Sequence, residues 1–314
     1  MKIKVFIVTW QDAEALNNNL DSLFQVFNNN LNGIDLHINI INNHTNFSIN
    51  SNYQSHVNII HNRGTPDFAT AMLARMWNMA LIHGFKDLNN PDADLVVTAQ
   101  DDTVWNFDWL YQLIKVHRDF DFYADDAGDM VCSYTPNAVK KIGLWDERFH
   151  YGFGEGDYFL RAIKYLPERS TINDHAHGRV WNPSLHLAKR PEPDPNRYQE
   201  QDRSHQFRGL SWEVWNYKWK SYELEGKWPD NIQEMVDKTV PVAHHVLYPY
   251  FEMSVMFPFK PLLSSMPVIS VRHCFSVIYP LKYFSKLGIY FDTGSSSDSF
   301  PSSSNFKSKV TVSH

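Results

Sequence analysis

The first hundred residues alternate between short apolar runs and a stretch with helical spacing. Mostly β-branched runs lie at Lys4–Thr9, Leu36–Ile41 and Leu95–Ala99, with a shorter one at Val57–Ile60. Continuous apolar runs of this length are typical of strands buried on both faces of a parallel sheet. After the first run, apolar residues recur at helical spacing, namely Leu16, Leu20, Phe24 and Phe27. The order strand, helix, strand predicts an α/β fold with a doubly wound, mostly parallel sheet.

Capping residues and a further apolar run continue this alternation. Thr65, followed by Pro66, is a typical helix start. The apolar run at Met130–Tyr134 predicts another strand, and the segment TPNAVKKIG after it predicts a helix that Thr135 caps and Gly143 ends. One more helix is predicted between these points, with an apolar face formed by Trp109, Leu110, Leu113 and Val116.

The chain changes character after Pro191. The stretch PEPDPNRYQEQDRSHQ is polar and rich in proline, which predicts an exposed loop. We therefore expect an α/β domain over residues 1–205 and a helical, aromatic extension over 206–291. The Ser-rich segment 292–314 is expected to be disordered.

Composition and charge exclude some function classes. The chain has 314 residues, 43% of them hydrophobic, which is enough for a substantial core. Its net charge of -6 provides no basic surface, so nucleic acid is not expected as a partner. Cys132 and Cys274 match neither a disulfide framework nor a zinc spacing, which favours a reducing compartment. The apolar run at the N-terminus breaks too early for a secretory signal, so we expect a cytoplasmic location.

Polar residues follow each predicted parallel strand. In an open α/β sheet the carboxyl ends of the strands share one edge, where ligands bind. That edge would gather Thr9 and Trp10, Asn42 and Asn43, Asn62–Gly64, and Gln100–Asp102. The adjacent charges of Asp101 and Asp102 cost stability unless a positive group lies between them and a partner. A cation with a phosphate would meet that need, but a polar turn or a helix cap explains the dipeptide equally well.

Two later stretches carry further candidate groups. In LWDERFHYGFGEGDYFLRA, Glu155 stands between two glycines, where the backbone can approach a ligand closely. Asp157 precedes an apolar helical stretch and could equally cap that helix. In VWNPSLHLAKR, the imidazole of His186 can bind a cation as the neutral base, and packing at a strand edge is the alternative.

Taken together, these stretches resemble the GT-A fold glycosyltransferases over roughly residues 2–189, in particular the large inverting family of bacterial and viral glycan synthesis. The resemblance rests on the order and spacing of several motifs. It implies that residues 1–105 bind a nucleotide sugar and residues 106–205 bind the acceptor. It also implies a divalent cation, Mn²⁺ or Mg²⁺, that neutralises the charge developing on the leaving pyrophosphate.

The resemblance assigns roles to the ends of the first and fourth strands. Asp102 would bind the cation and Asp101 would face the ribose or a sugar hydroxyl. Gln100 stands where the family usually has an acid. Thr9 and Trp10 would contact the base and ribose of the donor.

The second and third strands would complete the donor site. Asn43, with Asn42 as the neighbouring option, stands where the family has an Asp that reads the nucleobase. An amide offers both a donor and an acceptor, which suits a uracil or a guanine edge, so the donor is expected to be a UDP- or GDP-sugar. In the loop Asn62–Gly64, Arg63 would meet a phosphate; a simple turn is the other explanation.

On the acceptor side, the family's E-D-x-D pattern places the catalytic base at Glu155, with Asp157 as the second choice. Gly154 stands where the family has its first acid. His186, at the end of a P-x-x-x-H pattern, would be a further ligand of the cation.

The sequence allows more than one role for the aromatic residues. The helical spacing of the tryptophans in 212–219 predicts packing against the α/β domain, whereas Trp145 and Trp181 are the candidates for stacking on a sugar. Segment 248–291 lacks the unbroken apolar span needed to cross a bilayer. A second hydrophobic layer, a dimer surface or a peripheral membrane contact that suits a lipid-linked acceptor are the alternatives.

The sequence therefore predicts a metal-dependent, inverting glycosyltransferase whose acceptor is a hydroxyl of a glycan or a lipid-linked molecule. A sugar-phosphate nucleotidyltransferase would need a Gly-rich, basic loop after the first strand, and TWQDAEAL is neither. A non-catalytic module that binds nucleotides or carbohydrates is the other rival, because Gln100 and Gly154 depart from the family's acids.

Overall fold

The structure is a computed structural model that describes residues 1–25, 33–44, 47–62, 73–125, 129–149, 152–174, 179–180, 186–189 and 208–219. The chain divides into two compact units, Met1–Met266 and Pro267–His314, and every described residue lies in the first. Several predictions concern residues outside this set, namely the helix start at Thr65, the loop after Pro191, segments 248–291 and 292–314, Arg63, Gly64 and Trp181.

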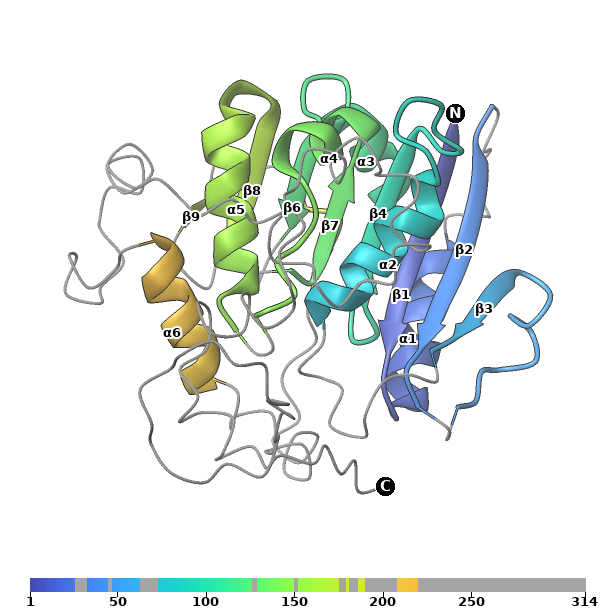
Figure 1. Ribbon diagram of the computed structural model, residues 1–314. Coiled ribbons are helices and arrows are strands. Elements are labelled where there is room, and N and C mark those ends of the chain that lie inside the picture. Colours follow the sequence, from blue (N-terminus) through green and yellow to red (C-terminus); the bar gives the residue numbers. More distant parts are fainter. Residues whose placement is uncertain are drawn as a thin grey trace, which may run out of the picture. The chain divides into compact units, whose positions relative to one another are not determined.

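A mixed sheet forms the centre of the first unit (Figure 1). Its strands are adjacent in the order β3, β2, β1, β4, β7, β6, β8, β9. The mutually parallel strands are β1 (Lys2–Thr9), β2 (Asp35–Asn42), β3 (Val57–His61) and β4 (Leu95–Gln100). The remaining strands are β7 (Val131–Tyr134), antiparallel to β4 and to β6 (Phe122–Asp125), then β8 (Ser170–Asp174), parallel to β6, and β9 (Arg179–Val180). A short second sheet pairs β5 (Val104–Trp105) with β10 (Ala188–Lys189). The predicted α/β class with a mostly parallel sheet is confirmed.

Helices cover both faces of the sheet. One face carries α1 (Ala13–Phe24) and α3 (Trp109–Val116), and the other carries α2 (Leu73–Phe85), α4 (Pro136–Ile142) and α5 (Gly154–Tyr165). A 3-10 turn at Pro167–Arg169 follows α5, and α6 spans Arg208–Trp219. No helix among the described residues is long and apolar enough to cross a membrane.

The continuous apolar run of β1 is buried on both sides. Ile3, Val5 and Ile7 belong to the core that α1 and α3 cover, whereas Phe6 points to the opposite face, towards α2. There Gly84 of α2 lies so close to the sheet that a Cβ at this position would overlap with the side chain of Val96. The close approach of α2 to β4 therefore depends on a glycine.

Capping chemistry sets the limits of α4. The Thr135 hydroxyl accepts a hydrogen bond from the backbone N–H of Ala138 at 3.2 Å, and Pro136 is the first helical residue. Gly143 ends the helix with a φ of 89°, which favours glycine. The predicted helix and both of its caps are confirmed.

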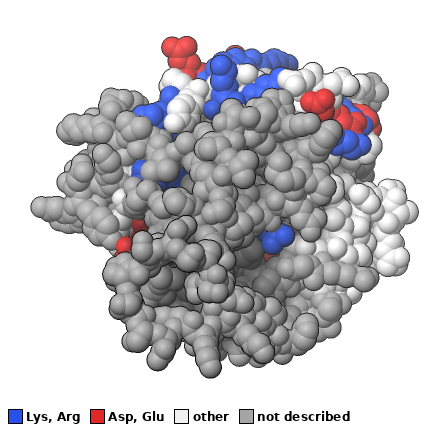
Figure 2. All heavy atoms as spheres, in the orientation of Figure 1, with Lys and Arg blue, Asp and Glu red and all other residues white. Residues whose placement is uncertain are grey.

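Charge pairs lie towards the amino end of β1. The carboxylate of Asp92 lies 2.8, 2.9 and 2.6 Å from the ammonium groups of Lys2, Lys4 and Lys86. Hydrogen bonds from these three lysines lower the pKa of Asp92. Figure 2 shows Lys and Arg side chains interspersed with Asp and Glu along the upper edge of the molecule, where Figure 1 places the N-terminus. These opposite charges are local pairs on a solvated edge.

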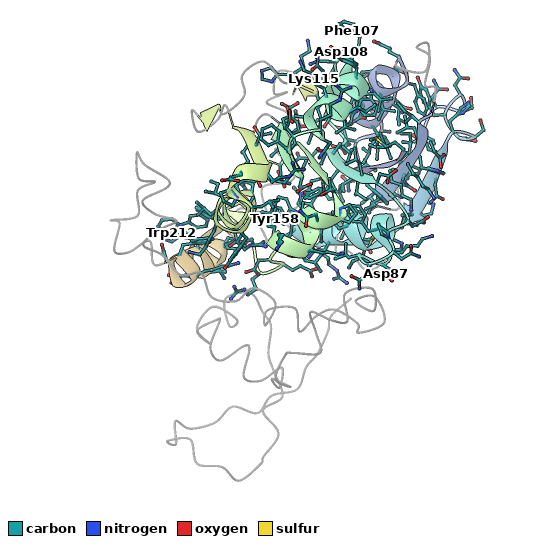
Figure 3. The ribbon with its side chains drawn as sticks, turned by 90° about the horizontal axis from the view of Figure 1, so that it is seen from above. Asp87, Phe107, Asp108, Lys115, Tyr158 and Trp212 are labelled. Carbon is teal, nitrogen blue, oxygen red and sulfur yellow. The ribbon has the colours of Figure 1, made fainter. Side chains whose placement is uncertain are left out.

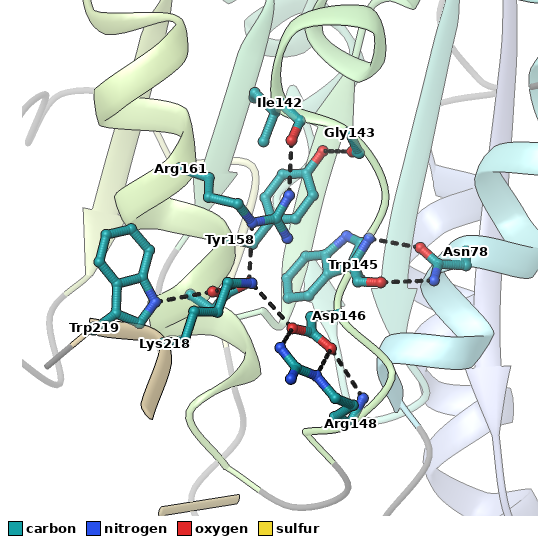
Figure 4. A network of polar contacts seen from close by, with 11 residues as sticks. Asn78, Ile142, Gly143, Trp145, Asp146, Arg148, Tyr158, Arg161, Lys218 and Trp219 are labelled. Carbon is teal, nitrogen blue, oxygen red and sulfur yellow. Dashed lines mark hydrogen bonds and ion pairs between the residues drawn. The ribbon is translucent and has the colours of Figure 1, made fainter. Parts of the chain in front are cut away.

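A buried ionic network joins α6 to α5 and to the loop before it (Figure 4). The Lys218 ammonium lies 3.0 Å from the Asp146 carboxylate and 2.6 Å from that of Asp157. Arg148 pairs with Asp146 at 2.7 Å, and Arg161 pairs with Asp157 at 3.0 Å. All five side chains are 0% exposed. Burial acts to raise the pKa of Asp146, but the charges of Arg148 and Lys218 outweigh it and hold this pKa low.

Aromatic packing surrounds the same network. Trp219 donates its indole N–H to Asp157 at 2.9 Å, and Trp215 packs against Phe149 and Phe153. In the view from above, Tyr158 lies inside the packed region, whereas Phe107 is 74% exposed at the outer edge (Figure 3). The predicted packing of the tryptophans in 212–219 against the α/β domain is confirmed for Trp215 and Trp219, both of which are buried.

We expect Lys218→Met to destabilise the protein strongly, because each of the buried carboxylates of Asp146 and Asp157 loses a charged partner that lies within 3.0 Å. Removing one partner of a buried ion pair costs about 3 to 5 kcal/mol. Chemical denaturation of the purified chain measures the loss. The control is Lys115→Met on the exposed side of α3, which should change stability by less than about 0.5 kcal/mol. Equal effects of the two variants would contradict this role of Lys218.

Candidate functional site

The carboxyl ends of the four parallel strands are tied together by hydrogen bonds. The Thr9 hydroxyl donates to the Asp101 carboxylate at 2.9 Å, which joins β1 to the turn after β4. The backbone N–H of Asn43 donates to the Thr9 carbonyl at 3.1 Å, and that of Asn62 donates to the Asn42 carbonyl at 2.8 Å. The structure thus brings together, at one edge, the described strand-end residues that the sequence predicts.

Asp101 and Asp102 occupy different environments within one turn. The same Asp101 oxygen that accepts from Thr9 also accepts the backbone N–H of Trp10 at 3.3 Å, so the Asp101 carboxylate links β4 to β1. Asp102 is 5% exposed. The turn closes with the N–H of Thr103 donating to the Gln100 carbonyl at 3.2 Å. Neither carboxylate caps the next helix, because α3 starts after Asp108.

The amides at the ends of β2 and β3 contact each other. The side-chain NH₂ group of Asn62 donates to the side-chain oxygen Oδ1 of Asn43 at 2.9 Å. The Asn42 side chain donates to the backbone carbonyl of His44 at 2.8 Å and accepts the His44 N–H at 3.0 Å, and its Nδ2 also lies 3.1 Å from Nδ1 of His61 in β3. The local bonds of Asn42 favour Asn43 as the amide that faces a ligand.

The indole of Trp10 provides a test of whether this edge suits a ligand. Its N–H is buried and has no hydrogen-bond partner within the part of the chain that the structure describes. A buried polar group without a partner costs about 1 to 3 kcal/mol, so such groups are rare unless they serve a ligand or a bound water. The predicted role of Trp10 in holding the donor fits this observation.

Two acidic residues near this edge were not predicted from the sequence. Asp129, just before β7, accepts the Gln100 amide at 2.8 Å and the Trp77 indole N–H at 2.7 Å. Asp125 ends β6, is 0% exposed and lies 3.4 Å from Nδ1 of His186. Both belong to the acidic stretch 125–129, from the last residue of β6 to just before the start of β7. The position of these acids at a strand end was the sequence signal that could have identified them.

Glu155 lies in the first turn of α5, after Gly152 and Phe153, which both have φ near +65° (66° and 63°). The pKa of the buried Cys132 thiol is raised by burial first, and the negative charges of Asp129, Asp125 and Glu155 add to this effect. β8 follows α5 and runs parallel to β6, and β6 and β4 are both antiparallel to β7. Helix α5 runs back along the sheet to the start of β8, so its first turn, with Glu155, lies towards the carboxyl ends of β4 and β6.

The structure gives Asp157 a packing role and not the accessible position of a base. The residue is 0% exposed. Its carboxylate forms ion pairs with Arg161 and Lys218 and accepts a hydrogen bond from the indole N–H of Trp219. It also does not cap α5, because this helix begins at Gly154. The second choice for the base is corrected accordingly.

Trp145 is likewise part of the core and not a platform for a sugar. It is 1% exposed and stacks on Tyr158 with ring centroids 4.4 Å apart. Its backbone N–H and carbonyl both bind the side chain of Asn78, at 2.7 and 2.9 Å. These bonds come from α2, distant in sequence, so the local pattern did not reveal them.

The donor atoms at this edge suit a hard divalent cation. Carboxylate oxygens and imidazole are ligands of Mn²⁺ and Mg²⁺ sites, and such cations complete their shells with phosphate oxygens and water. Nδ1 of His186 lies 3.4 Å from the buried carboxylate of Asp125, a contact of the kind that orients an imidazole ligand. Among the described residues, no group of three or more His, Cys, Asp or Glu side chains is arranged to hold a metal. Asp102 and His186 would therefore hold a cation only together with ligand oxygens.

No protein-family model matches the sequence, and no curated protein matches it. Among solved structures, a mannosyltransferase from Pyrobaculum calidifontis with GDP-Man and Mn²⁺ is 9% identical, with a TM-score of 0.42 over 91% of this chain and 83% of that one. TarS residues 1–349 from S. aureus with UDP is also 9% identical, with a TM-score of 0.44 over 91% and 78%. Glucosyl-3-phosphoglycerate synthase from Mycobacterium tuberculosis with Mn²⁺ and UDP is 8% identical, with a TM-score of 0.40 over 64% and 76%.

A buried acid lies beside the site, in the loop before α5. Glu147 is 6% exposed, and burial raises its pKa to about 8, although a hydrogen bond from Asn78 at 2.9 Å and the charge of Arg75 act in the opposite direction. The carboxyl group is therefore mainly protonated at neutral pH in the folded chain. In the unfolded chain it would ionise near its ordinary pKa of 4.5.

We expect Glu147→Gln to remove a loss of stability that occurs as the pH rises from 5 to 8. A raised folded-state pKa gives stability that is fully present below pH 4.5 and is lost as the pH rises through about 8. The loss attributable to this group is roughly 3 to 4 kcal/mol between pH 5 and 8. Denaturation curves across this range measure it, with Glu168→Gln at an exposed position as the control. An unchanged pH dependence in Glu147→Gln would refute the assignment.

Proposed function

We propose that this protein is a glycosyltransferase that moves a sugar from a nucleoside diphosphate sugar, with UDP or GDP as the nucleotide, to a hydroxyl of a glycan or lipid-linked acceptor. The acceptor oxygen forms a bond to the anomeric carbon from the face opposite the leaving group. The bond between that carbon and the diphosphate oxygen breaks, and the nucleoside diphosphate leaves with the electron pair. The transfer inverts the anomeric configuration.

One observation carries the proposal: the hydrogen-bonded edge that joins the carboxyl ends of β3, β2, β1 and β4. It combines a buried indole N–H, paired amides and two carboxylates within one continuous set of strand ends. Base recognition needs donors and acceptors, and a pyrophosphate needs a cation held by carboxylates. This edge offers both kinds of group side by side.

The residues of this chain divide the work between donor and acceptor. Asp102 and His186 are the protein ligands of a Mn²⁺ or Mg²⁺ ion, which when bound neutralises the charge on the leaving diphosphate. Glu155, on the acceptor side, accepts the proton of the attacking hydroxyl as the general base. Its position in the first turn of α5, towards the carboxyl ends of the strands, supports this role.

We also propose a cytoplasmic location for this activity, and residues 248–291 are our candidate for a peripheral membrane contact with a lipid-linked acceptor. The rival is a non-catalytic protein that binds the nucleotide or the sugar alone. Gly154, which replaces an acid of the family pattern, is the observation that favours this rival.

Titration calorimetry with UDP and GDP tests the donor site. We expect one nucleotide to bind only with Mn²⁺, and Asp102→Ala to weaken that binding by about ten-fold or more, because a carboxylate ligand of the cation is lost. Asp119→Asn, at an exposed position after α3, is the control and should bind like the wild-type chain. Absence of binding to either nucleotide with Mn²⁺ would overturn the proposed function.

Hydrolysis of the sugar nucleotide, with water in place of the acceptor, tests the base without knowledge of the acceptor. Glu155→Gln should lower the rate by roughly 10² to 10⁴-fold and leave nucleotide binding intact, since a general base contributes about that much. Asp157→Asn is the contrasting variant, expected to lower stability through its buried ion pairs. Wild-type binding without any turnover would favour the non-catalytic rival, and full activity of Glu155→Gln would remove the base assignment.

A further inference from the structure

Gln100 is fixed through its main chain at the end of β4. Its backbone N–H donates to the Met130 carbonyl at 3.0 Å, and its own carbonyl accepts the Asn19 side-chain amide at 2.9 Å. These bonds connect Gln100 to β7 on one side and to α1 on the other. The start of its side chain is thereby held next to Asp101 and Asp102.

The side chain of Gln100 is oriented by Asp129. Its Nε2 donates to Oδ1 of Asp129 at 2.8 Å, while Oδ2 of the same carboxylate accepts the indole N–H of Trp77 at 2.7 Å. Trp77 is 0% exposed in α2, so the far side of Asp129 is anchored in the core. An ionised carboxylate accepts hydrogen bonds and donates none. Therefore only the NH₂ group of the amide can face Asp129, and the carbonyl oxygen must point away from it.

We propose that Asp129 is a positioning residue that turns the Gln100 amide so that its oxygen, and not its NH₂ group, faces the donor site. This inference rests on the proposed function. The amide oxygen would bind an electropositive group, either a hydroxyl hydrogen of the sugar nucleotide or the divalent cation. An NH₂ group in the same place would repel both. The neutral Gln100 is in this way a working acceptor beside Asp101 and Asp102, and it adds no third negative charge to their turn.

Isosteric amide and acid exchanges test this orientation. In Asp129→Asn the new side chain still accepts the Trp77 indole with its oxygen, so its NH₂ group faces Gln100 and the Gln100 amide must turn over. Adding Gln100→Glu to this variant restores an acceptor, because one Glu oxygen accepts from the new NH₂ group and the other faces the donor site. Gln100→Glu alone places two carboxylates in contact, which disfavours ionisation of both.

Nucleotide binding with and without Mn²⁺ is the first readout. We expect Asp129→Asn to weaken binding of UDP or GDP by about ten-fold or more, the usual effect of reversing one buried polar contact, and the double variant to recover most of it. A loss seen only with Mn²⁺ assigns the oxygen to the cation, and a loss seen also without Mn²⁺ assigns it to a hydroxyl. Normal binding by Asp129→Asn, or no recovery in the double variant, would overturn the inference.

Stability of the ligand-free chain is the second readout, and it does not depend on the function. Gln100→Glu alone should lower the unfolding midpoint at pH 8 more than at pH 5, and Asp129→Asn should cancel that loss in the double variant. Additive effects of the two exchanges would contradict the coupling of these side chains. If the coupling is present while the wild-type chain binds neither nucleotide, the proposed function fails, and the role of Asp129 towards a donor fails with it.

Discussion

The burial of five charged side chains between α5, α6 and the loop before α5 is the constraint on which the second half of the structure depends. Asp146, Arg148, Asp157, Arg161 and Lys218 are fully removed from water, where each charge is stable only with its partners in contact. Lys218 of α6 contacts both carboxylates, Asp146 and Asp157, and these contacts fix the position of the helix. The same contacts hold the first turn of α5, which carries Glu155, so a helix distant from the strand ends helps to set the acceptor side of the site.

The parallel strands were predictable because their physical requirements are local. A strand buried on both faces needs a continuous apolar run, and β1 shows this from Ile3 onward, with every residue buried up to Thr9. The caps of α4 are local too, since Thr135 and Gly143 act within one turn of the residues that they serve. The rule that parallel strands share a carboxyl edge then placed the polar residues that follow them at one rim.

The site residues that the sequence did not reveal depend on contacts between distant segments. Asp129 is identified by its bonds to Trp77 and Gln100, which lie on α2 and β4, and no spacing in the sequence joins these three positions. The two corrections have the same cause. The carboxylate of Asp157 suits chemistry, but Lys218, more than sixty positions away in the chain, pairs with it in the core. Asn78, also more than sixty positions away, holds the backbone of Trp145, whose indole stacks on Tyr158 in the core. Residue type and local pattern show what a side chain can do, whereas distant partners decide what it does.

The adjacent acids after β4 illustrate how the fold gives similar side chains different tasks. The Asp101 carboxylate accepts hydrogen bonds from the Thr9 hydroxyl, at the end of β1, and from the N–H of Trp10, which follows β1, so it connects the ends of two strands. On the other side Gln100 is neutral and bound to Asp129, which keeps a third charge out of the same turn. Asp102, 5% exposed, is the second acid of this turn and the one that we propose as a ligand of the cation. A neutral residue before the two acids thus limits like-charge repulsion at the edge where the negative pyrophosphate would also have to bind.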